Sequence, residues 1–385
     1  MTETNEPPEL RAARDLAPRI RELAPLIESE RKLPVELVEQ LREAGMFHLF
    51  VPHSLGGSET DPVTAARVVE EVAAADGSAG WCVMIAAQCM AMIGTLPDEH
   101  AREMCEGREV VAAVARPIGR AIPEGDGYRV SGRWPFASGS SHAGWLGGEC
   151  TIYDGPEPRK DAQGNAVTRM LFLRRAEVTV HDTWHTHGLR GTASNDFSAE
   201  DVYVPAGRGF QMLVDDPVHP WPLFKALPLV FVTHGAQALG VARAAIESAA
   251  EVAAAKAGYG ENHKLRDETR IQGSFAEATA VADSARAYLY ATTQQLWDAT
   301  LAGDVDTARL RARVRLATTH AARASLAAVE LVAAAVGTSA LFTTSPLERQ
   351  LRDVRMAAAH VMVSPLTMEA AGRVELGLDA MFPFF

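Results

Sequence analysis

The spacing of apolar residues along this chain changes twice, and these changes fix the order of its secondary structure. Up to about residue 109 apolar side chains recur every three or four positions, which predicts helices. From about 110 to 205 the period falls to two, which predicts strands. From about Ala226 long Ala/Leu/Val faces return, with the length of four-helix-bundle members. We therefore expect a mainly α protein with a central β domain, divided at 1–109, 110–225 and 226–385.

The central part is expected to be a compact antiparallel β domain. Pro and Gly clusters, at Pro117–Gly119 and Gly125–Gly127 among others, separate its strands. The expected strands are Val110–Ala115, Tyr128–Trp134, Trp145–Ile152, Thr168–Leu173, Val178–Asp182 and Phe197–Val204. The expected helices after it are Ala226–Ala257, Asp267–Leu301, Asp304–Val336 and Glu348–Val363.

Composition excludes several classes of function. The formal net charge of −12 argues against a nucleic-acid or anionic-membrane partner. The longest apolar run, near Leu227–Ala242, is interrupted by His234 and Gln237 and is not expected to span a membrane. The N-terminus lacks the features of a secretion signal. The four cysteines show no CxxC spacing and are expected to be reduced thiols in a cytoplasmic protein.

Several stretches resemble the acyl-CoA dehydrogenase superfamily, and together they extend over nearly the whole chain. They are Leu41–Gly57, Glu70–Ser78, Gly132–Ser138, Gly188–Thr192, Val202–Pro205 and Arg349–Asp353. The resemblance implies an N-terminal helical domain, a middle antiparallel β domain and a C-terminal four-helix bundle. Within the superfamily, Trp134–Trp145, Gly188–Ser194 and Arg352–His360 look like the oxygenase components of two-component flavin-dependent monooxygenases related to 4-hydroxyphenylacetate hydroxylase.

The absence of a carboxylate base supports that subdivision. An acyl-CoA dehydrogenase removes a proton next to a thioester, which requires a carboxylate beside the flavin. The family places this glutamate in one of two regions, which here are Met356–Pro365 and Pro217–Ile246. Neither contains Asp or Glu, and His360 stands in the first.

The resemblance assigns catalytic roles to His360 and Ser138. A neutral imidazole at His360 would take the proton of a phenol, or stabilise a flavin C4a-hydroperoxide by hydrogen bonding. Ser138 would contact the flavin N5 edge, and Phe136 would lie beside the ring. The competing interpretations are a satisfied histidine for His360, a turn cap for Ser138 and an ordinary core position for Phe136.

Five further residues are weaker candidates for the site. Arg190 either binds the flavin phosphate or pyrimidine carbonyls, or forms an ion pair with Asp182 or Asp196. Arg266, with Lys264 and Arg270, lies where the superfamily uses a basic residue from a neighbouring subunit on the flavin phosphate. Trp81 and Gln88 would line the substrate pocket or simply fill the core, and His142 is a secondary pocket candidate with a structural or surface alternative. His181, His185 and His187 lack further ligands at metal-site spacing, so no metal is expected.

The sequence thus predicts an oxygenase component that hydroxylates a small aromatic or phenolic substrate. It would use reduced flavin (FMNH2 or FADH2) and O2. Because no Gly-x-Gly-x-x-Gly follows a strand, a separate NAD(P)H-dependent flavin reductase is the expected partner. A homotetramer or homodimer is expected from the resemblance. The alternatives are an acyl-CoA dehydrogenase, an N- or S-oxygenating enzyme of the same fold, and a non-enzymatic flavin-binding protein.

Overall fold

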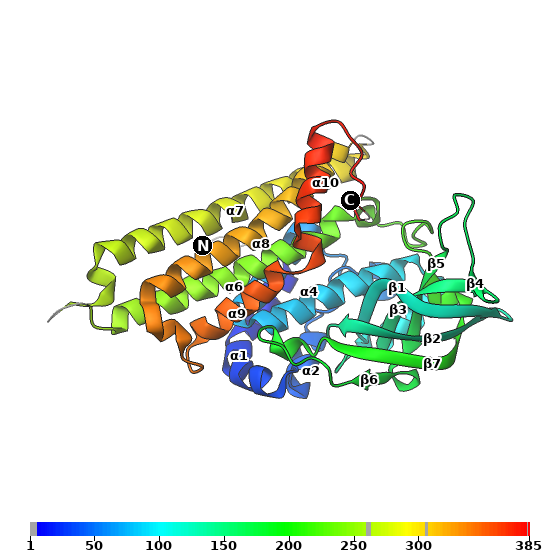
Figure 1. Ribbon diagram of the computed structural model, residues 1–385, viewed down its shortest axis with the longest axis horizontal. Coiled ribbons are helices and arrows are strands. Elements are labelled where there is room, and N and C mark those ends of the chain that lie inside the picture. The colour runs from blue at the N-terminus through cyan, green and yellow to red at the C-terminus, as the bar shows by residue number, and fades with distance from the viewer. Residues whose placement is uncertain (1–5, 259–262, 305–306, 383) are drawn as a thin grey trace.

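The fold consists of helices, then a sheet, then helices, in the order that the change of period predicts. A computed structural model of the protein describes residues 6–258, 263–304, 307–382 and 384–385. The long C-terminal helices and the sheet lie at opposite ends of the molecule, and α4 runs between them (Figure 1). The prediction of a mainly α protein with a central β domain is confirmed.

The first group of helices surrounds one fully apolar helix. Its members are α1 (Pro8–Glu30), α2 (Val35–Glu43), α3 (Pro62–Ala75), α4 (Gly77–Ala91) and α5 (Asp98–Cys105). Asp76 caps α4 by accepting from the Ala79 N–H, and every residue of α4 except Ile85 is buried. The Gln88 amide donates to the Thr233 hydroxyl at 2.9 Å, which satisfies this polar side chain inside the core.

The sheet is mixed, so the expectation of an antiparallel domain is wrong in one pairing. The order is β6-β7-β2-β1-β3-β5-β8, with β4 paired to β3. The bounds are β1 Val111–Glu124, β2 Gly127–Ala137, β3 Trp145–Asp154, β4 Glu157–Pro158, β5 Thr168–Arg174, β6 Thr179–His181, β7 Asn195–Pro205 and β8 Gly209–Phe210. β1 does not end at Pro117–Gly119 but continues through a register shift. β2 then returns along one side of β1, and β3 pairs with its other side in parallel.

The C-terminal helices form the elongated end of the molecule. They are α6 (Pro228–Ala255), α7 (Thr269–Ala302), α8 (Ala308–Val336), α9 (Pro346–Ala358) and α10 (Pro365–Glu375). The single helix expected over Glu348–Val363 is wrong at its end. It stops at Ala358, and His360 instead caps a short 3-10 turn over Val361–Val363 by accepting from the Met362 N–H.

Three helical segments are long and apolar enough to cross a membrane by length and composition. They are Gly77–Thr95, Pro228–Ala255 and Ala308–Leu341. In the first two, 89% and 83% of the most apolar window is buried inside the fold, which accounts for their composition as core. In the third only 50% is buried, so half of an apolar window lies on the surface.

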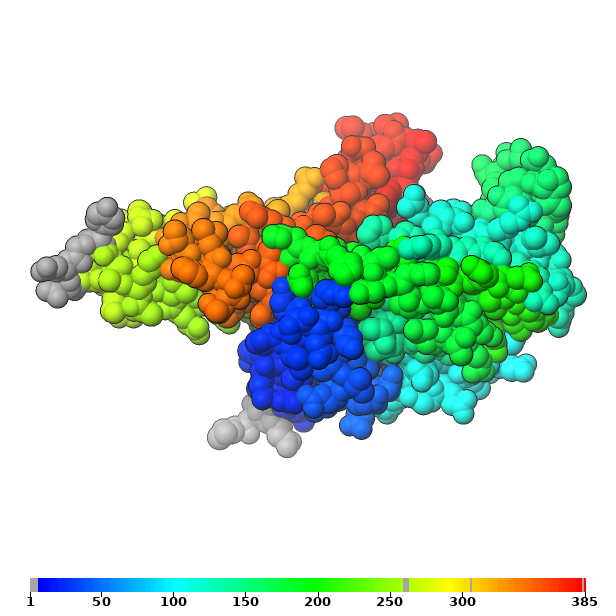
Figure 2. Space-filling model, turned by 60° about the horizontal axis from the view of Figure 1, so that its bottom comes forward, coloured from blue at the N-terminus to red at the C-terminus, as the bar shows by residue number. Residues whose placement is uncertain are grey.

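One buried carboxyl joins the three groups of elements. Asp353 on α9 is almost fully buried, and its Oδ1 accepts from the Leu189 N–H at 2.6 Å. Its Oδ2 lies against Gly77 at the start of α4, where a Cβ atom would approach it to 2.8 Å. The β6–β7 connection, which contains Leu189, lies between α9 and the N-terminal helices (Figure 2).

The protonation of this carboxyl is expected to affect stability. Burial and the neighbouring Asp76 carboxylate raise the pKa of Asp353 to about 7. The folded state therefore holds the proton more tightly than the unfolded chain. This contribution to stability is complete below about pH 4 and is lost as the pH rises through 7.

Asp353→Asn should remove this pH dependence, because an amide keeps the acceptor for Leu189 but does not titrate. The unfolding free energy of the variant minus that of wild type should therefore rise by at least about 1 kcal/mol from pH 4 to pH 7, because only wild type loses stability through this group. Denaturant unfolding at several pH values measures the difference. Asp154→Asn, at an exposed ion pair with Arg159, is the control and should not gain in this way. Parallel curves for wild type and Asp353→Asn would contradict the assignment.

Candidate functional site

The candidate site is built around a hydrogen bond between the buried helix and the end of a strand. Trp81, in the second turn of α4, donates from Nε1 to the Ser138 hydroxyl at 3.0 Å. Ser138 directly follows β2 and is 9% exposed, so its hydroxyl is buried rather than presented at an open turn. The structure thus brings together two residues that the sequence singled out separately.

The Ser138 hydroxyl belongs to a chain of hydroxyls whose direction follows from counting protons. Thr192 donates its single proton to the Leu189 carbonyl at 2.8 Å. Ser194, at 2.7 Å from the Thr192 oxygen, must then be the donor in that contact. Since the Ser194 proton is used, Ser138 is the donor across the 2.7 Å to Ser194. Ser138 thus accepts from Trp81 and donates to Ser194, so its remaining capacity is that of an acceptor.

Two histidines stack beside Trp81. The rings of His360 and His234 lie 4.6 Å apart between centroids, at an interplanar angle of 21°. Trp81 meets both rings edge-on, at 5.4 Å from His360 and 5.7 Å from His234. His234 comes from α6 and His360 from the turn after α9. These are the two regions in which a dehydrogenase would carry its glutamate.

Both imidazoles are neutral at pH 7. Burial, and next the charge of Arg315, lowers the pKa of His360 to about 4. Burial, followed by His360 and Arg315, lowers the pKa of His234 well below its ordinary value. The Nδ1 atom of His360 accepts from the Met362 N–H at 3.3 Å, so the ring proton lies on Nε2 and this nitrogen is a donor. Neither nitrogen of His234 has a partner among the described residues.

The cationic group beside these rings is Arg315 on α8, which is fully buried. Its guanidinium donates to the Met362 carbonyl at 3.1 Å and forms no ion pair within the described part of the chain. The only charged side chain that shifts the pKa of His360 is this arginine, and it is not a carboxylate. The cluster therefore contains imidazoles and a guanidinium where proton abstraction beside a thioester would need an acid side chain.

Phe136, two residues before Ser138, is not a core residue. Its ring is 66% exposed, and its backbone has a φ of +65°, a conformation that is costly for a bulky residue. The edge of Trp184 contacts the ring at 6.2 Å between centroids. The strained backbone at Phe136 thus exposes an aromatic ring two residues before Ser138, the last hydroxyl of the chain.

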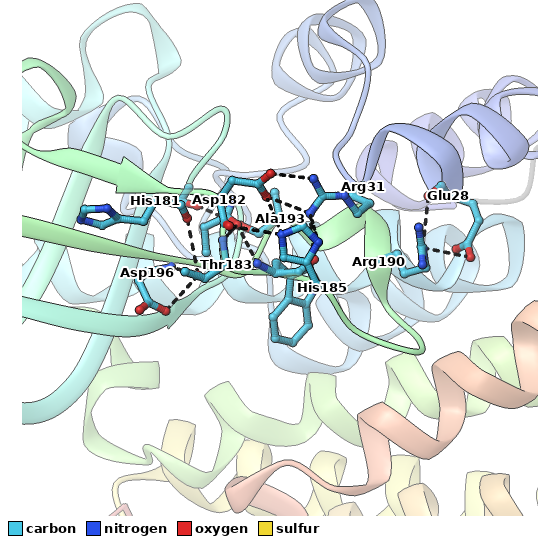
Figure 3. A network of polar contacts seen from close by, with 12 residues as sticks. Glu28, Arg31, His181, Asp182, Thr183, His185, Arg190, Ala193 and Asp196 are labelled. Atoms are coloured by element: carbon cyan, nitrogen blue, oxygen red, sulfur yellow. Dashed lines mark hydrogen bonds and ion pairs between the residues drawn. The ribbon is translucent and has the colours of Figure 1, made fainter.

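Arg190 forms an ion pair, but not with either predicted partner. Its Nε lies 3.3 Å from the Glu28 carboxylate of α1 (Figure 3). Asp182 instead pairs with Arg31, and Asp196 pairs with Arg133. The expected partners are wrong because the β6–β7 connection packs on α1, which brings Glu28 within reach of this guanidinium.

The remaining candidates lie apart from this cluster. Arg266 is exposed beside the C-terminal end of α6, where Leu265 donates to the Lys256 carbonyl. Lys256 is 22 positions after His234, about 33 Å along the helix. His142 is partly buried and stacks on Phe47 at 5.6 Å between ring centroids, which fits the structural alternative.

His181, at the end of β6, and His185, in the connection that follows it, are held by other polar groups. His181 contacts the Ser198 hydroxyl at 2.8 Å, and His185 lies close to Asp182 and Arg31 (Figure 3). Across the described ranges no group of three or more His, Cys, Asp or Glu side chains is arranged to hold a metal ion.

Sequence reasoning missed two members of the cluster, His234 and Arg315. His234 already interrupts an otherwise apolar helix, which is a signal that a buried polar group has a purpose there. Arg315 had no such signal, because α8 carries four other arginines, at positions 309, 311, 313 and 323, and nothing in the sequence pattern separates Arg315 from them.

Comparison with known proteins gives family matches at both ends of the chain. The model of the acyl-CoA dehydrogenase N-terminal domain matches residues 10–104, and that of the acyl-CoA dehydrogenase C-terminal domain matches residues 232–365. An indole-3-acetate monooxygenase of Acinetobacter baumannii is 30% identical, over 94% of this chain and 92% of its own. The flavin-dependent monooxygenase oxygenase subunit HsaA of Mycobacterium tuberculosis is 30% identical, over 92% of each chain.

A solved structure shares the fold over nearly the full length. XiaF from a Streptomyces species, in complex with FADH2 and glycerol, superposes with a TM-score of 0.87 at 23% identity. The match covers 97% of this chain and 96% of that one.

Proposed function

This chain belongs to the flavin-dependent monooxygenases of the acyl-CoA dehydrogenase fold, and we propose that it hydroxylates a small aromatic or phenolic substrate as an oxygenase component. The observation that carries the proposal is the cluster of Ser138, Trp81, His360 and His234. It supplies neutral donors and acceptors, and no carboxylate, at the positions where a dehydrogenase keeps its base.

The residues around Ser138 fit a reduced flavin. The exposed Phe136 ring offers a flat apolar surface, and the neighbouring Ser138 hydroxyl has only acceptor capacity left. A reduced flavin carries a proton on N5, whereas N5 of an oxidised flavin is itself an acceptor. Ser138 therefore suits the reduced form. When bound, the reduced flavin would supply the two electrons that activate O2, and O2 is the co-substrate and the source of the transferred oxygen.

The protein groups position and polarise the reactants. His360 is neutral and donates from Nε2, which favours hydrogen bonding to an oxygen atom in the site over abstraction of a proton from a phenol. A nitrogen with a pKa of about 4 is a poor base at neutral pH. The neutral ring of His234 retains one unprotonated nitrogen that can accept from a substrate hydroxyl. Burial of both rings excludes water, which limits loss of activated oxygen as hydrogen peroxide.

The relatives support a two-component arrangement. One is named an oxygenase subunit, and another is an FADH2-dependent resorcinol hydroxylase, oxygenase component. We propose that a separate NAD(P)H-dependent reductase supplies this chain with reduced flavin, as FMNH2 or FADH2.

The function is tested by supplying reduced FMN and O2 with a panel of phenols and indoles and identifying hydroxylated products by mass spectrometry. His360→Ala should lower product yield about 100-fold, because it removes the Nε2 donor, and hydrogen peroxide should appear instead. His360→Gln, which restores an N–H near the Nε2 position, should recover part of the yield.

The control for this experiment is His320→Ala, because His320 is exposed on α8. Reduced-FMN affinity, measured in all three variants, should stay within about threefold of wild type. Unchanged product yield in His360→Ala would contradict the role of His360. No product from any compound in the panel, with wild type, would contradict the function itself.

The direction of the hydroxyl chain gives a second prediction. Thr192→Val leaves the Ser194 proton free to turn to Ser138, which can then donate its own proton to N5 of an oxidised flavin. The preference for reduced over oxidised FMN should fall about three- to tenfold. Anaerobic and aerobic equilibrium dialysis measures the two dissociation constants.

Thr293→Val is the matched control, because Thr293 is also fully buried but donates within α7 to the Leu289 carbonyl. An unchanged preference in Thr192→Val would contradict the proton order.

We also propose that the protein is a homodimer or homotetramer. Large apolar side chains are exposed after α9, namely Val361, Leu366, Leu376, Leu378 and Met381. Half of the apolar window of Ala308–Leu341 is exposed as well. Arg266 lies beside the C-terminal end of α6, about 33 Å along that helix from His234, so a role on the flavin phosphate would require a second copy.

Light scattering on the purified protein should give twice or four times the chain mass of 41.3 kDa. Leu376→Glu, placed in the exposed apolar set directly after α10, should shift the mass downward, whereas Glu369→Gln on α10 should not. A catalytically active monomer of wild type would contradict the proposal.

A further inference from the structure

Arg315 is a buried cation without a counter-charge. Its side chain is fully buried, and a guanidinium normally enters a protein interior only with an anionic partner. Its single hydrogen bond goes to the Met362 carbonyl at 3.1 Å. Nε and Nη1 have no partner among the described residues. At least two N–H-bearing nitrogens are therefore available to a ligand.

The surroundings of the guanidinium are aromatic. Its central carbon lies 5.3 Å from the Phe231 ring and 5.6 Å from the Phe382 ring. Phe231 in turn stacks with His234, at 6.4 Å between centroids and 25° between planes. Burial by rings of this kind fits an aromatic ligand better than a hydrated inorganic ion.

Arg315 and Ser138 lie at opposite ends of a continuous series of contacts. Ser138 touches Trp81, Trp81 touches both histidines, and Met362, two residues beyond His360, holds Arg315. A substrate ring held between these ends would have one edge toward Ser138 and the other toward the cation.

We propose that Arg315 determines substrate specificity by binding the carboxylate of an aromatic acid, a step that rests on the proposed function. One guanidinium and one carboxylate neutralise each other in the buried site, and the two unpartnered nitrogens receive acceptors. The ring is thereby oriented with its carboxylate away from Ser138 and with a ring edge toward the position of the flavin. The substrate class is a small arene that carries an acidic side chain.

The test compares two probes that differ only in the carboxylate, indole-3-acetate and 3-methylindole. Dissociation constants are measured by calorimetry with the reduced-FMN protein under anaerobic conditions, so that no turnover occurs. Wild type should bind indole-3-acetate at least tenfold more tightly than 3-methylindole. Arg315→Met should abolish this preference, and Arg315→Lys, which keeps the charge, should retain part of it.

Arg311→Met is the matched control, because Arg311 lies one turn earlier on α8 and donates to Thr307 and to the Lys225 carbonyl. It should keep the wild-type preference. Equal binding of both probes to wild type, or an equal loss of both in Arg315→Met, would overturn the proposal, the latter by assigning Arg315 a structural role. Inorganic phosphate that displaces indole-3-acetate at equal concentration would also overturn it.

Two features keep this test separate from the proposed function and from folding. If Arg315→Met fails to fold, as judged by circular dichroism, the wild-type preference and Arg315→Lys still decide the result. If wild type hydroxylates arenes but binds indole-3-acetate no more tightly than 3-methylindole, only the role of Arg315 is contradicted. Absence of any hydroxylated product would instead remove the proposed function.

Discussion

The hydrogen bond from the Leu189 N–H to Asp353 is the interaction on which the arrangement of the site depends. Asp353 fixes α9, and the residue that caps the turn after α9 is His360. Leu189 carries the carbonyl that receives the Thr192 proton, and so it sets the order of the hydroxyls as far as Ser138. A single buried carboxyl thus positions two groups. One is the His360 imidazole, which we assign to an oxygen atom in the site, and the other is the Ser138 hydroxyl, which we assign to the flavin.

The chemistry of the site follows from the neutral state of its two imidazoles and from the absence of a carboxylate beside them among the residues that the structure describes. Buried imidazoles with lowered pKa values stay neutral, and a neutral ring donates and accepts hydrogen bonds without abstracting a proton beside a thioester. The one buried charge near them is positive and unpaired within the described residues. The fold that this chain shares with the acyl-CoA dehydrogenases is compatible with either chemistry, and the side chains on α6 and after α9 separate the two.

Several individual residues of the candidate site could be singled out from the sequence. The small-residue segment after β2 identified Phe136 and Ser138, the apolar α4 identified Trp81, and the missing acid identified His360. The sequence did not predict that these residues contact one another. Trp81 and Ser138 are 57 positions apart in the chain, and Trp81 and His360 are farther apart still. Arg190 shows the same limit, since its partner Glu28 belongs to a helix more than 150 positions away in the chain.

The sequence by itself determined the order of helices and strands, the burial of α4 and the lack of a carboxylate base in two regions. These properties depend on local periodicity and residue type, which any single chain displays. Only the tertiary structure decided that β1 and β3 are parallel, that His234 stacks on His360 and that Arg315 is buried without an acid. Each of these depends on which distant segments pack together, and hydrophobic periodicity specifies that a face is buried but not what covers it.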